Sequence, residues 1–243
     1  MSNRQTEKSN QEPKKSGLLI RVTSAFTGIA IGIIILAFSH TIALPIVLAL
    51  IIIRALYELY RGVLKSEVSA RNKVFLLLPY TVMVILFTSL FYFIRNYDKE
   101  HGLFLLLLAL CGGWFADSGA YFVGRKLGTK FIKKRLAPNI SPKKTWEGFF
   151  GGVVTNMLIF PLIYFVYDTF VKDFDIGYFA VILLGVICAV FGTLGDLLYS
   201  ALKRKIKIKD FGRIMPGHGG ILDRFDSVIT IAPVFYLCVL CIA

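Results

Sequence analysis

Charged residues are scarce in this 243-residue sequence, where they make up only 18% of the chain. Hydrophobic residues make up 56%, whereas soluble domains usually contain about 45–50%. Too little polar sequence remains to cover a water-facing domain, and the same composition excludes a disordered chain or a collagen. The scarcity of charge therefore favours a protein embedded in a membrane.

Cysteine is also scarce, and each of the four residues lies inside an apolar run. A scaffold held together by disulfides is therefore excluded. The last two cysteines form a C-x-x-C motif, but a redox motif needs a solvated thiol in an electropositive setting. We therefore interpret all four as ordinary residues of membrane helices: Cys111, Cys188, Cys238 and Cys241.

Long apolar runs separate the blocks of charge, and crossing a bilayer takes about 20 such residues. The runs predict an all-α, polytopic integral membrane protein with about seven transmembrane helices, within a range of six to nine. The spans are expected at about 22–38, 41–59, 74–94, 102–123, 148–167, 176–198 and 222–242.

Basic residues give the formal net charge of +13, and they gather in alternate loops between the spans. This placement indicates membrane orientation rather than nucleic-acid binding, because cytoplasmic loops carry an excess of Lys and Arg. The N-terminus is therefore predicted in the cytoplasm and the C-terminus outside. The basic loops are 60–73, 124–147 and 199–221, and the loops poor in basic residues are 39–40, 95–101 and 168–175.

Three parts of the chain are expected to differ in role. Residues 1–17 are polar and basic and predict a disordered cytoplasmic tail. Residues 18–101 predict N-terminal membrane helices, which hold few charges besides Arg54 and Glu58. Residues 102–243 predict a catalytic membrane region with its active site on the cytoplasmic side.

Four aspartates are predicted at the cytoplasmic ends of three different spans. An ionised carboxylate inside a span costs roughly 2.5–3.5 kcal/mol on insertion scales, so such groups are normally paired, hydrated or bound to metal. Oxygen ligands that converge from several helices suit Mg²⁺, which favours carboxylates together with substrate phosphates. The alternative is a set of internal ion pairs with Arg125, Lys203 or Arg224. The four acids are Asp117, Asp196, Asp223 and Asp226.

The basic loops also contain residue types that bind phosphate. Three glycines precede the last span, where backbone N–H groups and the helix N-terminus favour an anion. Hydroxyl and ammonium groups in the 124–147 loop are typical phosphate donors, although a Gly-rich turn or a basic loop is also common without this role. The candidates are Ser141, Lys143, Lys144, Thr145, Lys203, Arg204, Lys209, Gly217, His218, Gly219, Gly220 and Arg224.

Four stretches together resemble the phosphatidate cytidylyltransferase family, also called CDP-diacylglycerol synthases. The longest is the signature S-x-x-K-R-x₄-K-D-x₅-P-G-H-G-G-x-x-D-R-x-D over residues 200–226. The motifs W-x-A-D-S-G-A-Y from Trp114, S-P-x-K-T-W-x-G from Ser141 and G-D at residues 195–196 precede it in the expected order. The first 100 residues or so resemble the family only in hydropathy and in the acid Glu58.

The resemblance implies that CTP and phosphatidic acid give CDP-diacylglycerol and pyrophosphate for phospholipid synthesis in the plasma membrane. It implies Mg²⁺ and a second, monovalent cation such as K⁺, and a homodimer. Asp196 and Asp223 become metal ligands, and Ser200 and Asp226 become ligands or their neighbours. The phosphate contacts implied are Lys144, Lys203, Arg204, Lys209, His218 and Arg224, while Asp117 and Arg125 are further candidates for substrate binding.

The expected mechanism needs no general base. The attacking lipid phosphate is a monoester with a second pKa of about 6, so it is largely dianionic at neutral pH. His218 is therefore interpreted as a donor to phosphate. Asp196, Asp223, Asp226, Lys144 and His218 form the predicted catalytic set. Three other functions are alternatives to cytidylyl transfer: a CTP-dependent kinase of a polyprenol, a transporter, and a scaffold that binds anionic lipid. The full signature argues against the kinase, and the lack of a repeat argues against the transporter.

Overall fold

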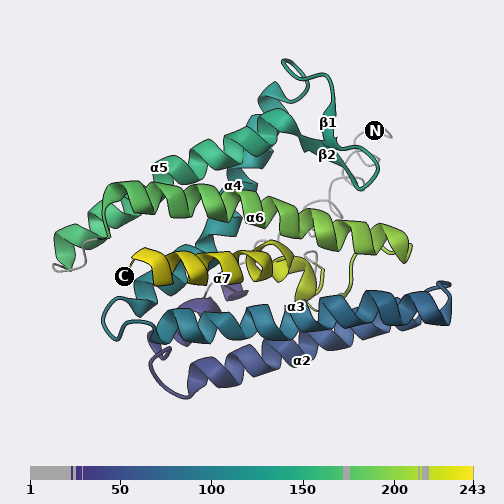
Figure 1. The fold of residues 1–243 in the computed structure, drawn as a ribbon, viewed down its shortest axis with the longest axis horizontal. Coiled ribbons are helices and arrows are strands. Elements are labelled where there is room, and N and C mark those ends of the chain that lie inside the picture. Colours follow the sequence, from purple (N-terminus) through teal and green to yellow (C-terminus); the bar gives the residue numbers. More distant parts are fainter. Residues whose placement is uncertain are drawn as a thin grey trace, which may run out of the picture.

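Six long helices build the described part of the protein. The computed structural model describes residues 23, 26–28, 30–171, 176–212, 214 and 219–242. Within these residues, six helices are long and apolar enough to cross a membrane, which confirms the predicted all-α polytopic fold. They are α2 (Ala43–Leu64), α3 (Ala70–Asn96), α4 (Gly102–Leu127), α5 (Trp146–Phe170), α6 (Tyr178–Lys205) and α7 (Leu222–Ile242) (Figure 1).

The six helices correspond to the last six of the seven expected spans. The first expected span, about 22–38, lies partly outside the described residues. A shorter apolar helix runs from Phe26 to Ala37. The expected tail over residues 1–17 lies wholly outside the described part of the chain.

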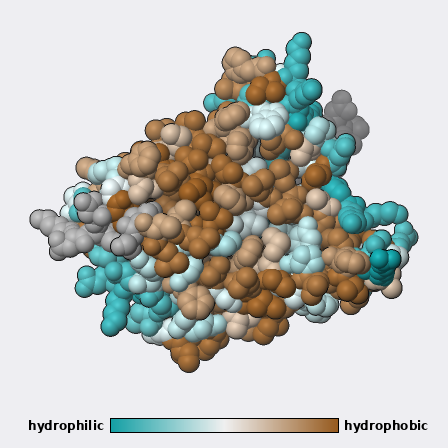
Figure 2. All heavy atoms as spheres, in the orientation of Figure 1, coloured by the Kyte–Doolittle hydropathy of each residue, from teal (hydrophilic) through white to brown (hydrophobic). Residues whose placement is uncertain are grey.

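Successive helices run in opposite directions, so alternate connections lie at the same end of the bundle. In Figure 1 the connections after α2, α4 and α6 share one end, where α7 begins. These connections are the three basic loops, so the alternation expected from charge agrees with the path of the chain. Hydrophobic side chains cover the middle of the face in Figure 2, and hydrophilic ones gather toward its ends. Large apolar side chains such as Leu158 and Phe179 are exposed on the helices, where they can contact lipid.

The centre of the bundle is packed closely through small residues and one buried amide. The Nδ2 of Asn156 on α5 donates to the carbonyl oxygens of Gly112 on α4 and Gly185 on α6, both at 3.0 Å. A Cβ added at Gly112 would lie only 2.8 Å from the Cβ of Cys188. Small residues and interhelical hydrogen bonds are the usual means by which membrane helices associate. This packing fixes α4, α5 and α6 relative to one another.

A short antiparallel hairpin lies in the connection between α4 and α5, with β1 at Arg135–Ala137 and β2 at Ser141–Thr145. The sequence pattern does not predict this hairpin. The segment is short and strongly basic, and it lacks the alternation of apolar and polar residues that indicates a strand. Arg135 pairs with Thr145 in the ladder, and the Thr145 hydroxyl accepts from the N–H of Gly148 at 3.1 Å. The hairpin therefore leads directly into the capped start of α5.

Candidate active site

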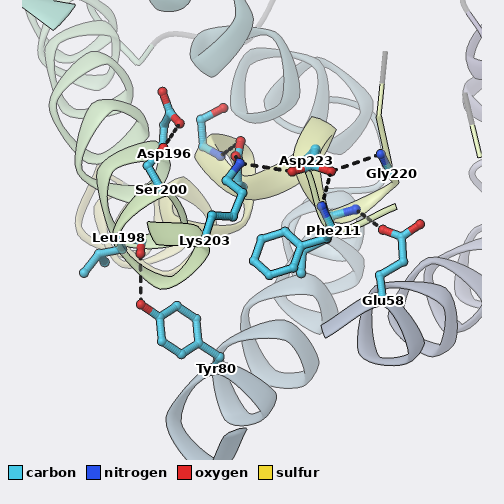
Figure 3. Close-up of polar contacts among 12 residues, drawn as sticks. Glu58, Tyr80, Asp196, Leu198, Ser200, Lys203, Phe211, Gly220 and Asp223 are labelled. Atoms are coloured by element: carbon cyan, nitrogen blue, oxygen red, sulfur yellow. Dashed lines mark hydrogen bonds and ion pairs between the residues drawn. The ribbon is translucent and has the colours of Figure 1, made fainter. Parts of the chain in front are cut away.

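Acidic and basic side chains meet between the C-terminal end of α6 and the beginning of α7. The Nζ of Lys203 on α6 lies 3.0 Å from Asp223 Oδ1 and 3.5 Å from Asp226 Oδ2, both on α7. Figure 3 shows Lys203 reaching from α6 toward Asp223. The two aspartates are three residues apart on one face of a helix. One buried ammonium group therefore balances two buried carboxylates.

A second ion pair brings the hairpin to the same end of α6. The Nζ of Lys144 on β2 lies 2.5 Å from Asp196 Oδ2. Ser200, one turn further along α6, donates to Asp196 Oδ1 at 3.2 Å. About a quarter of the Asp196 side chain is exposed, compared with 3% of Asp223. Of these carboxylates, Asp196 is the more accessible to a ligand arriving from solution.

Asp223 is also bonded to the backbone of the segment that precedes α7. Its Oδ2 accepts from the N–H of Phe211 at 2.8 Å and from the N–H of Gly220 at 3.0 Å. Gly219 adopts a positive φ of 90°, a conformation that favours glycine, and lies against the same carboxylate. Both oxygens of Asp223 are therefore engaged, and the carboxylate fixes the described ends of this segment.

Asp117, on α4, lies within electrostatic range of Lys144 and Asp196 and next to Ser227 on α7. The alternative of internal ion pairs is confirmed for Lys203, which pairs with Asp223 and Asp226. Among the described residues Arg125 forms no such pair, and its Nη1 donates to the Tyr121 hydroxyl at 3.3 Å. The structure thus gathers Asp117 with the acids of α6 and α7, as expected from the sequence, and places Arg125 on the outer surface of α4.

The remaining candidates are spread around this end of the bundle. Arg204 donates to the carbonyl oxygen of Ile140 at 3.2 Å, which joins α6 to the hairpin. Lys209 lines a cavity of about 920 Å³ together with Arg61 and Lys65, beside the acidic cluster rather than within it. Ser141 and Thr145 are half-buried on β2, whereas Lys143 and Arg224 are exposed. Gly217 and His218 lie outside the described residues.

Two acids outside the predicted set have clear structural roles. Glu147 lies in the first turn of α5, and its Oε1 accepts from the N–H groups of Phe131 and Ile132 at 3.0 and 2.8 Å. Chain reversal at the hairpin brings the 131–132 backbone to Glu147. Glu58 on α2 accepts from the N–H of Leu222 at 3.0 Å. Its only signal in the sequence was an acid near the end of an apolar run.

The arrangement of the carboxylates determines whether they could hold a metal ion. Within the described part of the chain, no three His, Cys, Asp or Glu side chains group closely enough to hold a metal by themselves. Mg²⁺, however, usually takes only one or two carboxylates and completes its coordination with water and substrate phosphates. Asp196 on α6 and Asp226 on α7 lie near enough to interact electrostatically. These residues fit an ion shared with a phosphate-bearing substrate, and a cage of protein ligands alone does not fit.

The fold defines a polytopic membrane protein, with a cluster of acidic and basic side chains at one end of its helices. Comparison with known proteins gives the family of the chain. The model of the cytidylyltransferase family matches residues 26–242, almost the whole of the described chain. The chain therefore belongs to the cytidylyltransferase family, in agreement with the resemblance found in the motifs.

Individual relatives carry a more specific name. The phosphatidate cytidylyltransferase of Bacillus subtilis is 42% identical over 194 residues, which are 72% of this chain and 68% of that protein. That of Haemophilus influenzae is 45% identical over 141 residues, or 58% of this chain and 47% of the relative. That of Staphylococcus saprophyticus is 39% identical over 154 residues, or 63% and 56%. The chain thus spans about half to two thirds of the length of these curated relatives.

Proposed function

We propose that the chain transfers the cytidylyl group of CTP to phosphatidic acid and forms CDP-diacylglycerol and pyrophosphate. The observation that carries the proposal is the cluster in which Lys144 and Lys203 meet Asp196, Asp223 and Asp226 at the ends of two membrane helices. A site at the ends of membrane helices would be accessible both to a lipid headgroup and to a nucleotide from solution. The positive-inside rule supports a cytoplasmic location for this end, where CTP is available, at the plasma membrane.

The reaction forms one bond and breaks another at the α-phosphorus of CTP. An oxygen of the lipid phosphate attacks this phosphorus, and the bond to the bridging oxygen of the β-phosphate breaks to release pyrophosphate. The attacking monoester, with a second pKa of about 6, is already largely dianionic near neutral pH. No side chain has to remove a proton, so the barrier lies in bringing two anions together.

The basic residues of the site carry the positive charge needed to bring the two anionic substrates together. Lys144, on the hairpin, and Lys203, on α6, are held beside the carboxylates and offer ammonium groups to phosphate oxygens. Asp196 and Asp226 would hold Mg²⁺, which supplies charge neutralisation to the phosphates of CTP and to the leaving pyrophosphate when it is bound. The resemblance adds K⁺ and a homodimer as further proposals.

A transfer assay with two labelled forms of CTP tests this function. The purified protein in lipid vesicles receives phosphatidic acid, Mg²⁺, K⁺ and CTP labelled in either the α- or the γ-phosphate. The expected result is that α-label enters the lipid, that γ-label appears in pyrophosphate, and that EDTA abolishes both. Transfer of γ-label to a polyprenol would instead indicate a CTP-dependent kinase and would contradict the proposal.

A further inference from the structure

Glu58 connects the N-terminal helices to the beginning of α7. It lies near the C-terminal end of α2, only 1% exposed, and its Oε2 accepts from the N–H of Leu222, the first residue of α7. Arg54, one turn earlier on α2, lies 3.3 Å from Oε1 and partly balances the charge. Hydrogen bonds from backbone N–H groups at a helix N-terminus to a carboxylate are charge-assisted and favourable. Glu58 therefore caps a helix that begins 164 residues away in the chain.

Two glycines on either side of the 213–219 stretch lie directly against this carboxylate. A Cβ added at Gly212 or at Gly220 would lie less than 3.0 Å from Glu58 carboxylate atoms. Real Cβ atoms essentially never approach other atoms so closely. A side chain at either position would therefore have to displace the Glu58 carboxylate, and the close approach brings Gly212 and Gly220 beside one side chain of α2.

Asp223 holds the neighbouring backbone from the other side. It accepts from the N–H groups of Phe211 and Gly220, while Glu58 accepts from the N–H of Leu222 (Figure 3). We call Glu58 and Asp223 the carboxylate pair. Together they fix Phe211–Gly212 and Gly220–Leu222, the two described stretches that lead into α7.

Burying a carboxylate costs more free energy than an ordinary apolar contact between helices. An acid in a membrane span costs roughly 2.5–3.5 kcal/mol on insertion scales, whereas an apolar side chain would pack there without this cost. The carboxylate is useful where backbone N–H groups must be held in one place. The backbone held here leads directly into Asp223 and Asp226, which face Lys203 and Asp196 across α6.

We propose that Glu58 is a positioning residue for cytidylyl transfer, although it belongs to the N-terminal helices and lies outside the acidic cluster. It fixes the start of α7, so that the carboxylates of this helix keep their position relative to α6. The proposal rests on the proposed function, because positioning is measured through the rate of transfer.

The kinetic test compares Glu58→Ala with Glu58→Gln and with the matched control Glu67→Gln. Glutamine keeps an oxygen that accepts from Leu222, whereas alanine removes it. Glu58→Ala is expected to lower kcat about 100-fold, the effect of displacing reacting groups by about 1 Å, while KM for phosphatidic acid changes less than about threefold. Glu58→Gln is expected to keep more than about a tenth of native kcat. Glu67 pairs with Lys207 at 2.9 Å on the exposed surface, so Glu67→Gln is expected to stay within about twofold of native.

A second variant applies if Glu58→Ala does not fold. Gly212→Ala leaves Glu58 in place but pushes a methyl group against its carboxylate. The same loss of kcat is expected in protein that elutes as a single folded species. Native kcat in either folded variant, or a loss in Glu58→Gln equal to that in Glu58→Ala, would overturn the positioning role.

Limited proteolysis tests the same contact without any substrate. Trypsin is expected to cleave Glu58→Ala after Lys207 and Lys209 faster than the native protein, because Phe211–Gly212 has lost its contact. Cleavage at the native rate would contradict the inference. If the native chain transferred no cytidylyl group, the proposed function would fail, and proteolysis would still decide whether Glu58 holds this segment.

Discussion

Lys203 is the residue on which the charge balance of the site depends. Its ammonium lies between the carboxylates of Asp223 and Asp226, and only 11% of the side chain is exposed. Removing one partner from a buried ion pair is strongly destabilising, by about 3–5 kcal/mol, because it leaves a buried charge without compensation. Here the loss would leave two neighbouring carboxylates without their common cation.

Lys203→Met is therefore expected to lower the free energy of unfolding by about 3 kcal/mol or more in detergent. Added Mg²⁺ should recover part of this loss, since a divalent cation can balance the same carboxylates. The control is Lys207→Met, whose ammonium pairs with Glu67 on the exposed surface and should contribute no more than about 1 kcal/mol. Equal Tm values for the two variants would contradict this account of the charge balance.

The sequence predicted the residue types of the site better than their partners. An acid in an apolar span must be compensated, and so Asp196, Asp223 and Asp226 could be singled out without a structure. Which cation meets which acid depends on how the helices are rotated and packed. The pairing of Lys144 with Asp196 further depends on a hairpin that was not predicted. Glu147 bonds to a backbone brought close by the same hairpin, so its role could not be deduced from its neighbours in sequence.

At the scale of helices, the site depends on the close crossing of α6 and α7 at Gly195. A Cβ at this position would lie 2.6 Å from the carbonyl oxygen of Asp226 and would collide with Thr230. The Thr230 hydroxyl donates to the carbonyl oxygen of Phe191 at 3.0 Å, one turn earlier on α6. Because Asp196 follows Gly195 directly, separation of the helices here would move Asp196 away from α7.

Gly195→Ala is expected to reduce the rate of transfer by about 100-fold, since displacements of about 1 Å near reacting groups have effects of this size. The same substitution at Gly32 serves as the control, because a Cβ there meets no atom within 4 Å. The measurement is kcat for each variant in protein purified as a single species. A Gly195→Ala enzyme with native kcat would show that the close crossing is not needed.

The long helices were the most predictable elements, because each needs about 20 apolar residues and these runs are conspicuous. The expected span of 102–123, for example, became α4 at Gly102–Leu127. A helix extends beyond its apolar run where the polar residues that follow remain helical at the membrane surface. The span of 176–198 accordingly became α6 at Tyr178–Lys205, which carries Lys203 into the site.

At the scale of the whole molecule, the basic loops at one end of the bundle predict its orientation. Glu67, between α2 and α3, belongs to that end, and Lys99, between α3 and α4, belongs to the other. Cytoplasmic loops are those rich in Lys and Arg, so Glu67 is expected inside and Lys99 outside.

Single-cysteine variants measure this orientation. In a chain whose four native cysteines are replaced by alanine, Lys99→Cys should react with an impermeant maleimide on intact cells. Glu67→Cys should react only after the cells are opened. Labelling of Glu67→Cys from outside would reverse the topology and would place the acidic cluster away from cytoplasmic CTP.

The central claim is that the carboxylates between α6 and α7 form the site of cytidylyl transfer, and Asp196 tests it most directly. Asp196 is the most exposed of the three acids paired with lysine there, and its substitution by asparagine keeps the shape of the side chain. The measurement is incorporation of α-label from CTP into lipid by Asp196→Asn and by Asp168→Asn, an exposed acid near the opposite end of α5. The account predicts a loss of about 100-fold or more for Asp196→Asn and a native rate for Asp168→Asn. A folded Asp196→Asn enzyme that keeps most of its activity would contradict it.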